Sequence, residues 1–223
     1  MIKRQRIFEK TSPYRDAQKI YIFCEGEKRE FDYFNFFVEI SSNLEIIPIP
    51  PEDSKSDPEK LLEQSEELFL KENSEKKLDY KEGDLIWFVI DTDNWEKDGK
   101  IATLREFCTH QNHDKKYIVW NVAQSNPCFE IWLYYHIFNA PPLQSEVGKF
   151  RSMKDFVDAN IKGGFNSRIH PTFIDSAIKN SRFNYKTDKS GCPTLFATEV
   201  FKLGDIIWKY AKNEILRKTN KMR

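Results

Sequence analysis

Acidic side chains follow two apolar segments of the chain at the point where each segment ends. Glu25 comes after the apolar run at 20–24, and Asp91 and Asp93 come after the run at 85–90. If the two runs are neighbouring parallel strands, their carboxyl ends place the three acids in one crevice, where such sheets bind ligands. Carboxylate oxygens are preferred ligands of Mg²⁺. The sequence therefore predicts a site that holds Mg²⁺ against a phosphate group.

The spacing of these acids favours ionised, metal-binding carboxylates. Gly26 lets the backbone turn tightly or approach a ligand closely after the strand, and the start of the following helix lowers the pKa of Glu25. Glu25 could also be no more than a helix-capping acid. Asp91 and Asp93 are two residues apart, and their charges repel each other unless a cation lies between them.

Other functions of an Asp-x-Asp segment explain less of the chain. A calcium-binding EF-hand loop needs glycine at its sixth position, where Glu96 stands. A phosphatase with an aspartyl nucleophile and a sugar-nucleotide transferase also use paired aspartates, but neither explains Glu25 followed by Gly26. These two functions are minor alternatives.

Apolar periodicity predicts four strands that alternate with helices. We expect strands at 19–24, 44–49, 85–90 and 117–122, and helices at 28–41, 58–72, 100–110 and 128–138. Asp57 followed by Pro58 marks the start of the second helix. Because the strands are apolar throughout, the sheet should be parallel, with right-handed crossovers and helices on both faces. The predicted fold class is α/β, with a core at 19–138.

The last third of the sequence is helical in its pattern. Segments at 153–160 and 171–181, and a long helix from about residue 193, predict a helical C-terminal extension at 139–223 that packs on the core. Its aromatic residues could form an interface, so an oligomer is compatible with the sequence.

Composition predicts a soluble, cytoplasmic protein. The 223 residues are 39% apolar and 14% aromatic, which is enough for a full hydrophobic core. No segment has the roughly 18 to 20 apolar residues that a membrane span needs, and we expect no signal peptide. The four cysteines include no Cys-x-x-Cys pair, as expected of free thiols in a reducing compartment.

Charge is balanced overall but unevenly distributed. The chain has 35 basic and 35 acidic residues, which argues against a nonspecific nucleic-acid coat. Both ends are basic, at 1–19 and 202–223. If the two ends lie close together, they form a surface that attracts phosphate; otherwise they are solvated tails.

Three segments carry a resemblance to a known family. A strand followed by Glu-Gly and a helix, and then a strand followed by Asp-x-Asp, is similar to the Toprim signature of topoisomerases, bacterial primases and the overcoming-lysogenization-defect nucleases. The segments at 22–30, 89–93 and 125–133 together resemble the RloB family, Toprim-like proteins of bacterial phage-defence and abortive-infection loci. The resemblance covers about 19–138 and implies a Toprim-like four-stranded parallel sheet flanked by helices.

The resemblance implies a nuclease that hydrolyses phosphodiesters with Mg²⁺ or Mn²⁺. Glu25 would be the Toprim glutamate, a general base or metal ligand, and Asp91 and Asp93 would bind the metal. Glu130 is a candidate for a further acid at the same crevice, one helical turn into the helix after the fourth strand. It could instead pair with a Lys or Arg on the surface.

Phosphate contacts are expected from residues around these acids. Ser125 and Asn126 should cap the helix after the fourth strand, where free backbone amides can hold a phosphate oxygen. Lys28 could steady a scissile phosphate or be simply solvated, and Gly26 would let a phosphate approach the backbone.

The implied partners are nucleic acid and an ATPase. The substrate is DNA or RNA, with tRNA among the candidates, because the carboxylates contact metal and phosphate and do not read bases. Families of this type are often encoded beside an ATPase, so a partner ATPase of a defence operon is expected. The alternative function is a non-catalytic Toprim scaffold that acts through such a partner.

Overall fold

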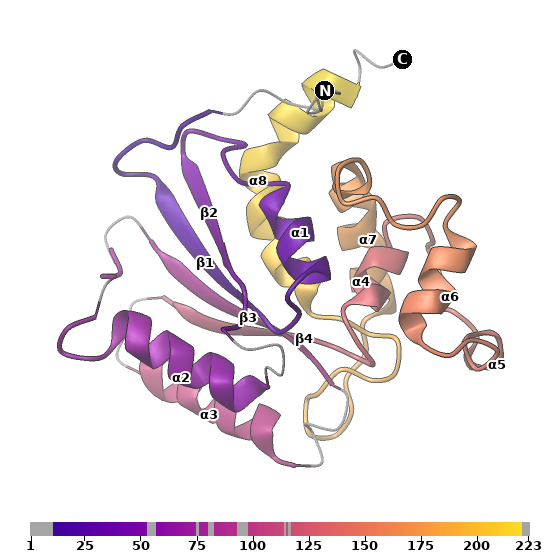
Figure 1. Ribbon diagram of the computed structural model, residues 1–223, viewed down its shortest axis with the longest axis horizontal. Helices are drawn as coiled ribbons and strands as arrows, with labels where there is room; N and C mark the ends of the chain where they lie inside the picture. The colour runs from indigo at the N-terminus through magenta and orange to yellow at the C-terminus, as the bar shows by residue number, and fades with distance from the viewer. Residues whose placement is uncertain are drawn as a thin grey trace.

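A parallel four-stranded sheet forms the centre of the molecule (Figure 1). The computed structural model describes residues 11–52, 57–74, 76–79, 83–92, 98–113, 115 and 117–219. The strands are β1 (Gln18–Cys24), β2 (Leu44–Ile49), β3 (Leu85–Asp91) and β4 (Trp120–Ser125). Their order is β2-β1-β3-β4, and each neighbouring pair is parallel. The prediction of a four-stranded parallel sheet in an α/β fold is confirmed.

The register of the strands brings their carboxyl ends to the same level. Cys24 of β1 lies opposite Val89 of β3, and Asp91 at the end of β3 lies opposite Ser125 at the end of β4. Residues that follow β1, β3 and β4 therefore meet at one rim of the sheet. This rim is where parallel sheets usually bind their ligands.

Helices cover both faces of the sheet (Figure 1). On one face lie α2 (Pro58–Phe69) and α3 (Lys100–Asn112), and on the other lie α1 (Arg29–Asn35) and α8 (Val200–Thr219). Successive side chains of a strand point to opposite faces. In β3, Phe88 packs with residues of α2 and α3, and Val89 packs with residues of α1 and α8. Both faces need apolar residues, which explains the unbroken apolar runs in the sequence.

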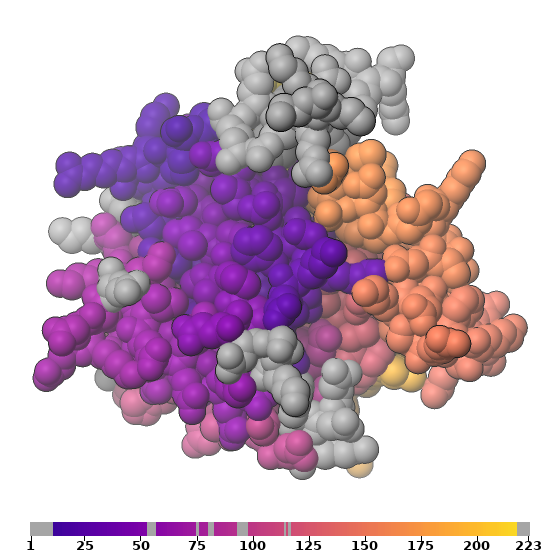
Figure 2. Space-filling model, in the orientation of Figure 1, coloured from indigo at the N-terminus to yellow at the C-terminus, as the bar shows by residue number. Residues whose placement is uncertain are grey.

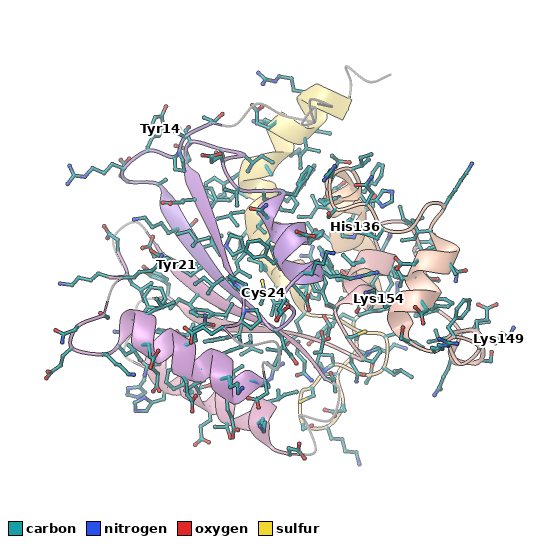
Figure 3. All side chains as sticks on the ribbon, viewed as in Figure 1. Tyr14, Tyr21, Cys24, His136, Lys149 and Lys154 are labelled. Carbon is teal, nitrogen blue, oxygen red and sulfur yellow. The ribbon has the colours of Figure 1, made fainter. Side chains whose placement is uncertain are left out.

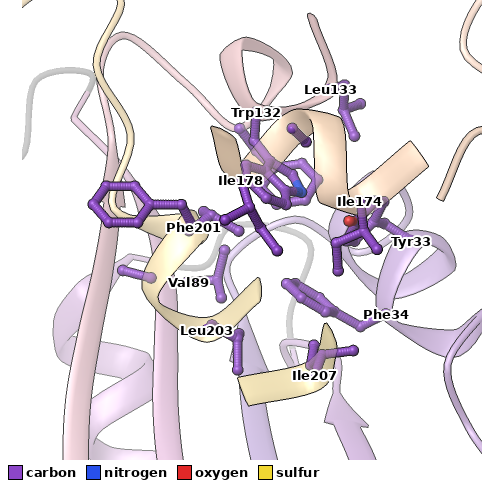
Figure 4. Close-up of a cluster of buried hydrophobic side chains, with 14 of the residues drawn as sticks. Tyr33, Phe34, Val89, Trp132, Leu133, Ile174, Ile178, Phe201, Leu203 and Ile207 are labelled. Carbon is purple, nitrogen blue, oxygen red and sulfur yellow. The ribbon is translucent and has the colours of Figure 1, made fainter. Parts of the chain in front are cut away.

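The other helices lie beside α1 and α8. They are α4 (Glu130–Tyr134), α5 (Gln144–Val147), α6 (Met153–Asn160), a 3₁₀ turn (His170–Phe173) and α7 (Ile174–Asn184). Figure 4 shows Trp132 of α4, Ile178 of α7 and Leu203 of α8 gathered near Val89 of the sheet, and all four belong to one buried cluster. The helical third therefore shares a core with the sheet, although α5 and α6 form a lobe at one side of the molecule (Figure 2).

Two helices are shorter than the sequence predicts. The helix expected at 28–41 ends at Asn35, and the helix expected at 128–138 spans only Glu130–Tyr134. After α1 the backbone bonds span three residues, as between the Phe37 amide and the Phe34 carbonyl (2.9 Å). After α4 the Tyr134 carbonyl accepts the amides of both Ile137 and Phe138, so bonds over three and four residues are mixed. Bonds over three residues wind the chain more tightly than an α-helix, and after α1 the tighter turns bury Phe37 completely.

The start of α2 is confirmed, whereas two other boundaries move. Asp57 caps α2, because its carboxylate accepts hydrogen bonds from the amides of Glu59 (3.0 Å) and Lys60 (3.1 Å). The fourth strand begins at Trp120, three residues later than expected, and the last helix begins at Val200. Pairing partners far along the chain set both of these boundaries.

The described parts of the two chain ends lie side by side. The Tyr210 hydroxyl of α8 donates a hydrogen bond to Oε1 of Gln18 at the beginning of β1 (2.9 Å). The described residues do not include 1–10, which hold most of the basic residues of the N-terminal end. They also do not include 220–223 at the C-terminal end. A phosphate-attracting surface at the two ends stays a prediction.

Two predictions from composition can be compared with the fold. All four cysteines are free thiols, and two of them, Cys24 and Cys108, are buried. Within the part of the chain that the structure describes, no helix is both long enough and apolar enough to cross a membrane.

Candidate functional site

Glu25 and Asp91 meet at the rim of the sheet. The Glu25 amide donates a hydrogen bond to the Val89 carbonyl of β3 (3.2 Å), which continues the pairing of the strands beyond Cys24. The Glu25 carboxylate in turn accepts a hydrogen bond from the Asp91 amide (Oε2 to N, 2.8 Å). Both side chains are half-buried. The acids that follow β1 and β3 are therefore neighbours.

A second bond ties Asp91 to the chain before α4. The Phe129 amide donates to Oδ1 of Asp91 (2.8 Å), and Phe129 occupies the N-cap position of α4. The free amides at a helix start attract anions, and here a carboxylate of the protein itself accepts one of them. Through Glu25 and Asp91, hydrogen bonds join the ends of β1 and β3 to the start of α4.

Asp93, the second aspartate of the predicted metal pair, lies outside the described residues. Within the described part of the chain, no group of three or more His, Cys, Asp or Glu side chains is placed to hold a metal ion. Glu25 and Asp91 still suit Mg²⁺ chemically, because Mg²⁺ is commonly bound by one or two carboxylates together with water and a substrate phosphate. The third carboxylate stays a prediction.

Glu130 lies close to these acids but pairs with an arginine. It is the first residue of α4, not one turn into the helix as predicted. Its Oε1 lies 3.6 Å from Nε of Arg29 in α1, and Nη2 of Arg29 lies 2.5 Å from Oδ2 of Asp158 in α6. The Glu130 side chain is only 14% exposed. Arg29 therefore neutralises Glu130 at the edge of the site, which agrees with the alternative of an ion pair.

Glu30 is a site residue that the sequence interpretation missed. Its side chain is almost fully buried in the first turn of α1. Burial is the largest cause that raises the pKa of Glu30 to about 7, and the charge of Glu130 adds to it, while backbone hydrogen bonds and Arg29 oppose it. The only signal in the sequence is a further acid five positions after Glu25. Such an acid in a first helical turn is usually solvated, so the local pattern gives no sign of its burial.

The Glu30 side chain also explains why residue 26 is glycine. A Cβ atom on Gly26 would lie 2.6 Å from Cδ and 2.7 Å from Oε1 of Glu30. These distances are far inside van der Waals contact, so any other residue would displace the Glu30 carboxyl. The close approach predicted at Gly26 is therefore made by a side chain of the protein.

Two thiols beside the acids are held in the protonated form. Cys24, at the end of β1 (Figure 3), is fully buried, and burial followed by the charge of Glu30 raises the pKa of its thiol well above the usual value. Burial, followed by the charges of Glu130 and Asp91, likewise raises the pKa of Cys128. Because thiolates, not thiols, bind metals, the carboxylates are the better candidates for metal ligands.

The prediction that Ser125 and Asn126 cap a helix is wrong. The Ser125 hydroxyl is buried against the Thr198 hydroxyl (2.8 Å), and the Asn126 side chain donates to the Pro193 carbonyl (2.8 Å). The helix begins at Glu130, with Phe129 at its N-cap and no side chain capping it. The Ser125 and Asn126 side chains instead hold the segment at 193–198.

Lys28, the remaining phosphate candidate, is exposed at the N-cap position of α1. Its carbonyl accepts the amide of Asp32 (2.8 Å). The position is three residues from Glu25, at the same rim of the sheet. It is compatible with a phosphate contact and with a solvated lysine.

Comparison with known families places most of the chain in one family model. A family described as RloB-like protein matches the chain over residues 20–205, which is most of its length. Among curated proteins and among solved structures there is no significant match.

Proposed function

The chain belongs to the RloB-like family, and we propose that it is a Toprim-type nuclease that hydrolyses phosphodiesters of nucleic acid with Mg²⁺ or Mn²⁺. We further propose that it acts in the cytoplasm as the effector of a bacterial anti-phage, abortive-infection system, together with a partner ATPase. The observation that carries the proposal is the contact between Glu25 and Asp91 at the rim of a parallel sheet. Acids at this rim are well placed to hold a cation beside a phosphate.

Glu25 would act as a general base or metal ligand, and Asp91 and Asp93 would bind the metal. A bound divalent ion would polarise the phosphate and lower the pKa of a coordinated water. The contribution of the chain itself is positioning. The Asp91 amide orients the Glu25 carboxylate, and the Phe129 amide orients the Asp91 carboxylate. Because these bonds exist before a substrate binds, little reorganisation is needed during the reaction.

The substrate is proposed at the level of the phosphodiester backbone. Carboxylates and metal ions contact phosphate oxygens and carry no base information, so DNA, tRNA and other RNA are all candidates. Arg29 is an unsuitable phosphate ligand, because Glu130 and Asp158 already pair with its guanidinium. Lys28 is the better cation for this role, since it is exposed at the rim.

The proposal is tested by nuclease assays with Mg²⁺ and Mn²⁺ on DNA, tRNA and other RNA, with and without the partner ATPase. We expect Glu25→Gln and Asp91→Asn to lower the cleavage rate by on the order of 100-fold or more, because changes next to a metal ligand already cost 10–100-fold. The matched control is Asp205→Asn, which removes an exposed acid of α8 that pairs with Arg182.

Two outcomes would contradict the proposal. Equal cleavage by the wild type, Glu25→Gln and Asp91→Asn would defeat the site assignment. Lasting inactivity of the wild type on every substrate, combined with normal binding to the ATPase, would favour the non-catalytic scaffold.

A further inference from the structure

A buried, ionised glutamate lies behind the rim, at the beginning of α8. Glu199 is 2% exposed. Its carboxylate contacts Nη2 of Arg105 (2.5 Å), Nζ of Lys202 (2.7 Å) and the Tyr185 hydroxyl (3.0 Å). Burial opposes the ionisation of Glu199, but the charges of Arg105 and Lys202 outweigh burial and lower its pKa. The glutamate is therefore an anion at neutral pH.

The segment that carries Glu199 is fixed to the end of β4. Ser125 and Thr198 form an antiparallel bridge, and the Glu199 amide donates to the Gln124 carbonyl (2.8 Å). Oε2 of Glu199 also accepts a hydrogen bond from the backbone amide of Gln124 (3.2 Å). Figure 1 shows this link between α7 and α8 running beside β4. Glu199 is thus placed next to the strand whose end borders the acids.

A chain of side-chain hydrogen bonds leads from Glu199 to the Asp-x-Asp segment. Arg105, which pairs with Glu199, donates from Nη2 to Oε1 of Gln124 (2.9 Å). Nε2 of Gln124 then donates to the Thr92 hydroxyl (2.9 Å). Gln124 is fully buried and Thr92 nearly so. Arg105 can only donate, so the side-chain oxygen of Gln124 must face Arg105 and its side-chain nitrogen must face Thr92.

Thr92 transmits this constraint to the backbone that follows Asp91. Its hydroxyl donates to the Ser125 carbonyl (2.9 Å), and its amide donates to the carbonyls of Ser125 (2.8 Å) and Pro127 (3.1 Å). The Thr92 hydroxyl has a single proton and donates it to the Ser125 carbonyl, so its oxygen can only accept the hydrogen bond from Gln124. The backbone that presents the Asp91 carboxylate is therefore held by bonds to the end of β4 and to Pro127.

Packing alone does not require this arrangement. Burying an acid and a guanidinium costs desolvation energy. Apolar residues of similar volume in their place often give the folded protein at least the same stability. The benefit of a polar chain is direction, because each hydrogen bond fixes the next group.

We infer that Glu199 is a positioning residue, which acts through Arg105, Gln124 and Thr92 to fix the end of β3 at Asp91 and Thr92 for metal binding. The inference rests on the proposed function only in assigning a metal to that strand end. It also makes the C-terminal third a part of the site, since Glu199 belongs to that third and directly precedes α8.

The first test is hydrogen exchange, followed by mass spectrometry, of the peptide that covers 88–92. We expect Glu199→Gln and Thr92→Val each to speed exchange there several-fold, and the double variant to add little, because both changes break the same chain of bonds. Thr92→Ser keeps the hydroxyl and should leave exchange at 88–92 unchanged. Asp205→Asn, in the same helix as Lys202, should also leave it unchanged. Thr92→Val alters no charge and serves as the probe if Glu199→Gln does not fold.

Faster exchange confined to 196–205 in Glu199→Gln, with 88–92 unchanged, would overturn the inference, since Glu199 would then act only on its own segment.

The second test is the affinity for Mn²⁺ measured by electron paramagnetic resonance. We expect about 10-fold weaker binding in Glu199→Gln, as for other residues behind metal ligands, and no change in Asp205→Asn. If the wild type binds no Mn²⁺, the proposed function fails, while the exchange result still decides on the positioning role.

Discussion

Glu30 and Gly26 constrain each other beside the proposed catalytic acid. The Glu30 carboxyl occupies the space that a side chain at position 26 would need, and it is almost fully buried there. Gly26 directly follows Glu25, so a change at position 26 would disturb the backbone next to the proposed catalytic acid. Two consequences can be measured.

Gly26→Ala should destabilise the protein by about 1 to 3 kcal/mol, the usual cost of inserting a carbon into a packed site. Urea denaturation gives the free energy of unfolding. Glu30→Ala should remove most of this cost, so that the double variant is more stable than the sum of the single effects indicates. Strictly additive effects would show that the two residues do not share the space.

Stability should fall as the pH rises through the neutral range because of Glu30. Its folded pKa of about 7 lies above the ordinary value of 4.5, so its contribution is fully present below pH about 4.5 and is lost as the pH rises through about 7. In urea denaturation at pH 5 and pH 8, Glu30→Gln should therefore gain stability relative to the wild type at the higher pH. A difference between variant and wild type that is the same at both pH values would contradict the raised pKa.

Sequence reasoning found some of these residues and missed others for physical reasons. Glu25 and Asp91 stand directly after apolar strands, and the level ends of parallel strands bring such residues together without further information. Whether Glu30 or Glu199 is solvated or buried depends on contacts with Gly26 and Arg105, which no local pattern reveals.

Between elements, Arg29 links the starts of α1 and α4 to the last turn of α6. It belongs to α1 and pairs with Glu130 of α4 and Asp158 of α6. The pairs are only partly shielded from water, because the Asp158 side chain is 40% exposed. Their effect on stability should therefore lie between that of a surface pair and that of a buried one.

Arg29→Gln should lower the free energy of unfolding by about 1 to 2 kcal/mol, because Glu130 then loses its partner in a shielded place. Lys179→Gln is the matched control, since Lys179 pairs with Asp175 in an exposed i, i+4 arrangement. The control should change stability by about 0.5 kcal/mol or less. Equal effects in the two variants would show that the Arg29 pairs are ordinary surface pairs.

Local signals predicted α2 well and the elements around β4 poorly. The cap and proline at its start define α2 within the segment itself. The polar residues Gln124 and Ser125 belong to β4, where they pair with Ile90 and Asp91 of β3, and the segment at 196–199 adds further bonds to them. Local sequence favoured a loop there, because both residues are polar and their pairing partners lie far away in the chain.

Across the whole molecule, the sheet and the helical third share one hydrophobic core. Val89 of the sheet, Trp132 of α4 and Leu203 of α8 belong to the same buried cluster (Figure 4). Composition and periodicity identified both parts, and they indicated that the extension packs on the core. They could not show that its helices fill the same face of the sheet as α1.

A shared core predicts that the protein unfolds in one cooperative transition. Urea unfolding followed by far-ultraviolet circular dichroism, which reports on all helices, should coincide with unfolding followed by tryptophan fluorescence, which reports on the buried Trp87, Trp120 and Trp132. A plateau between two transitions would instead indicate that 19–138 and 139–223 unfold as separate units.

The central claim is that Glu25 and Asp91 hold a catalytic divalent ion at the rim of the sheet. A crystal structure of the protein with Mn²⁺, with anomalous scattering used to locate the metal, tests it most directly. The account predicts an anomalous peak within bonding distance of the Glu25 and Asp91 carboxylates, and no peak in Asp91→Asn. Manganese bound elsewhere, or an unchanged peak in Asp91→Asn, would contradict it.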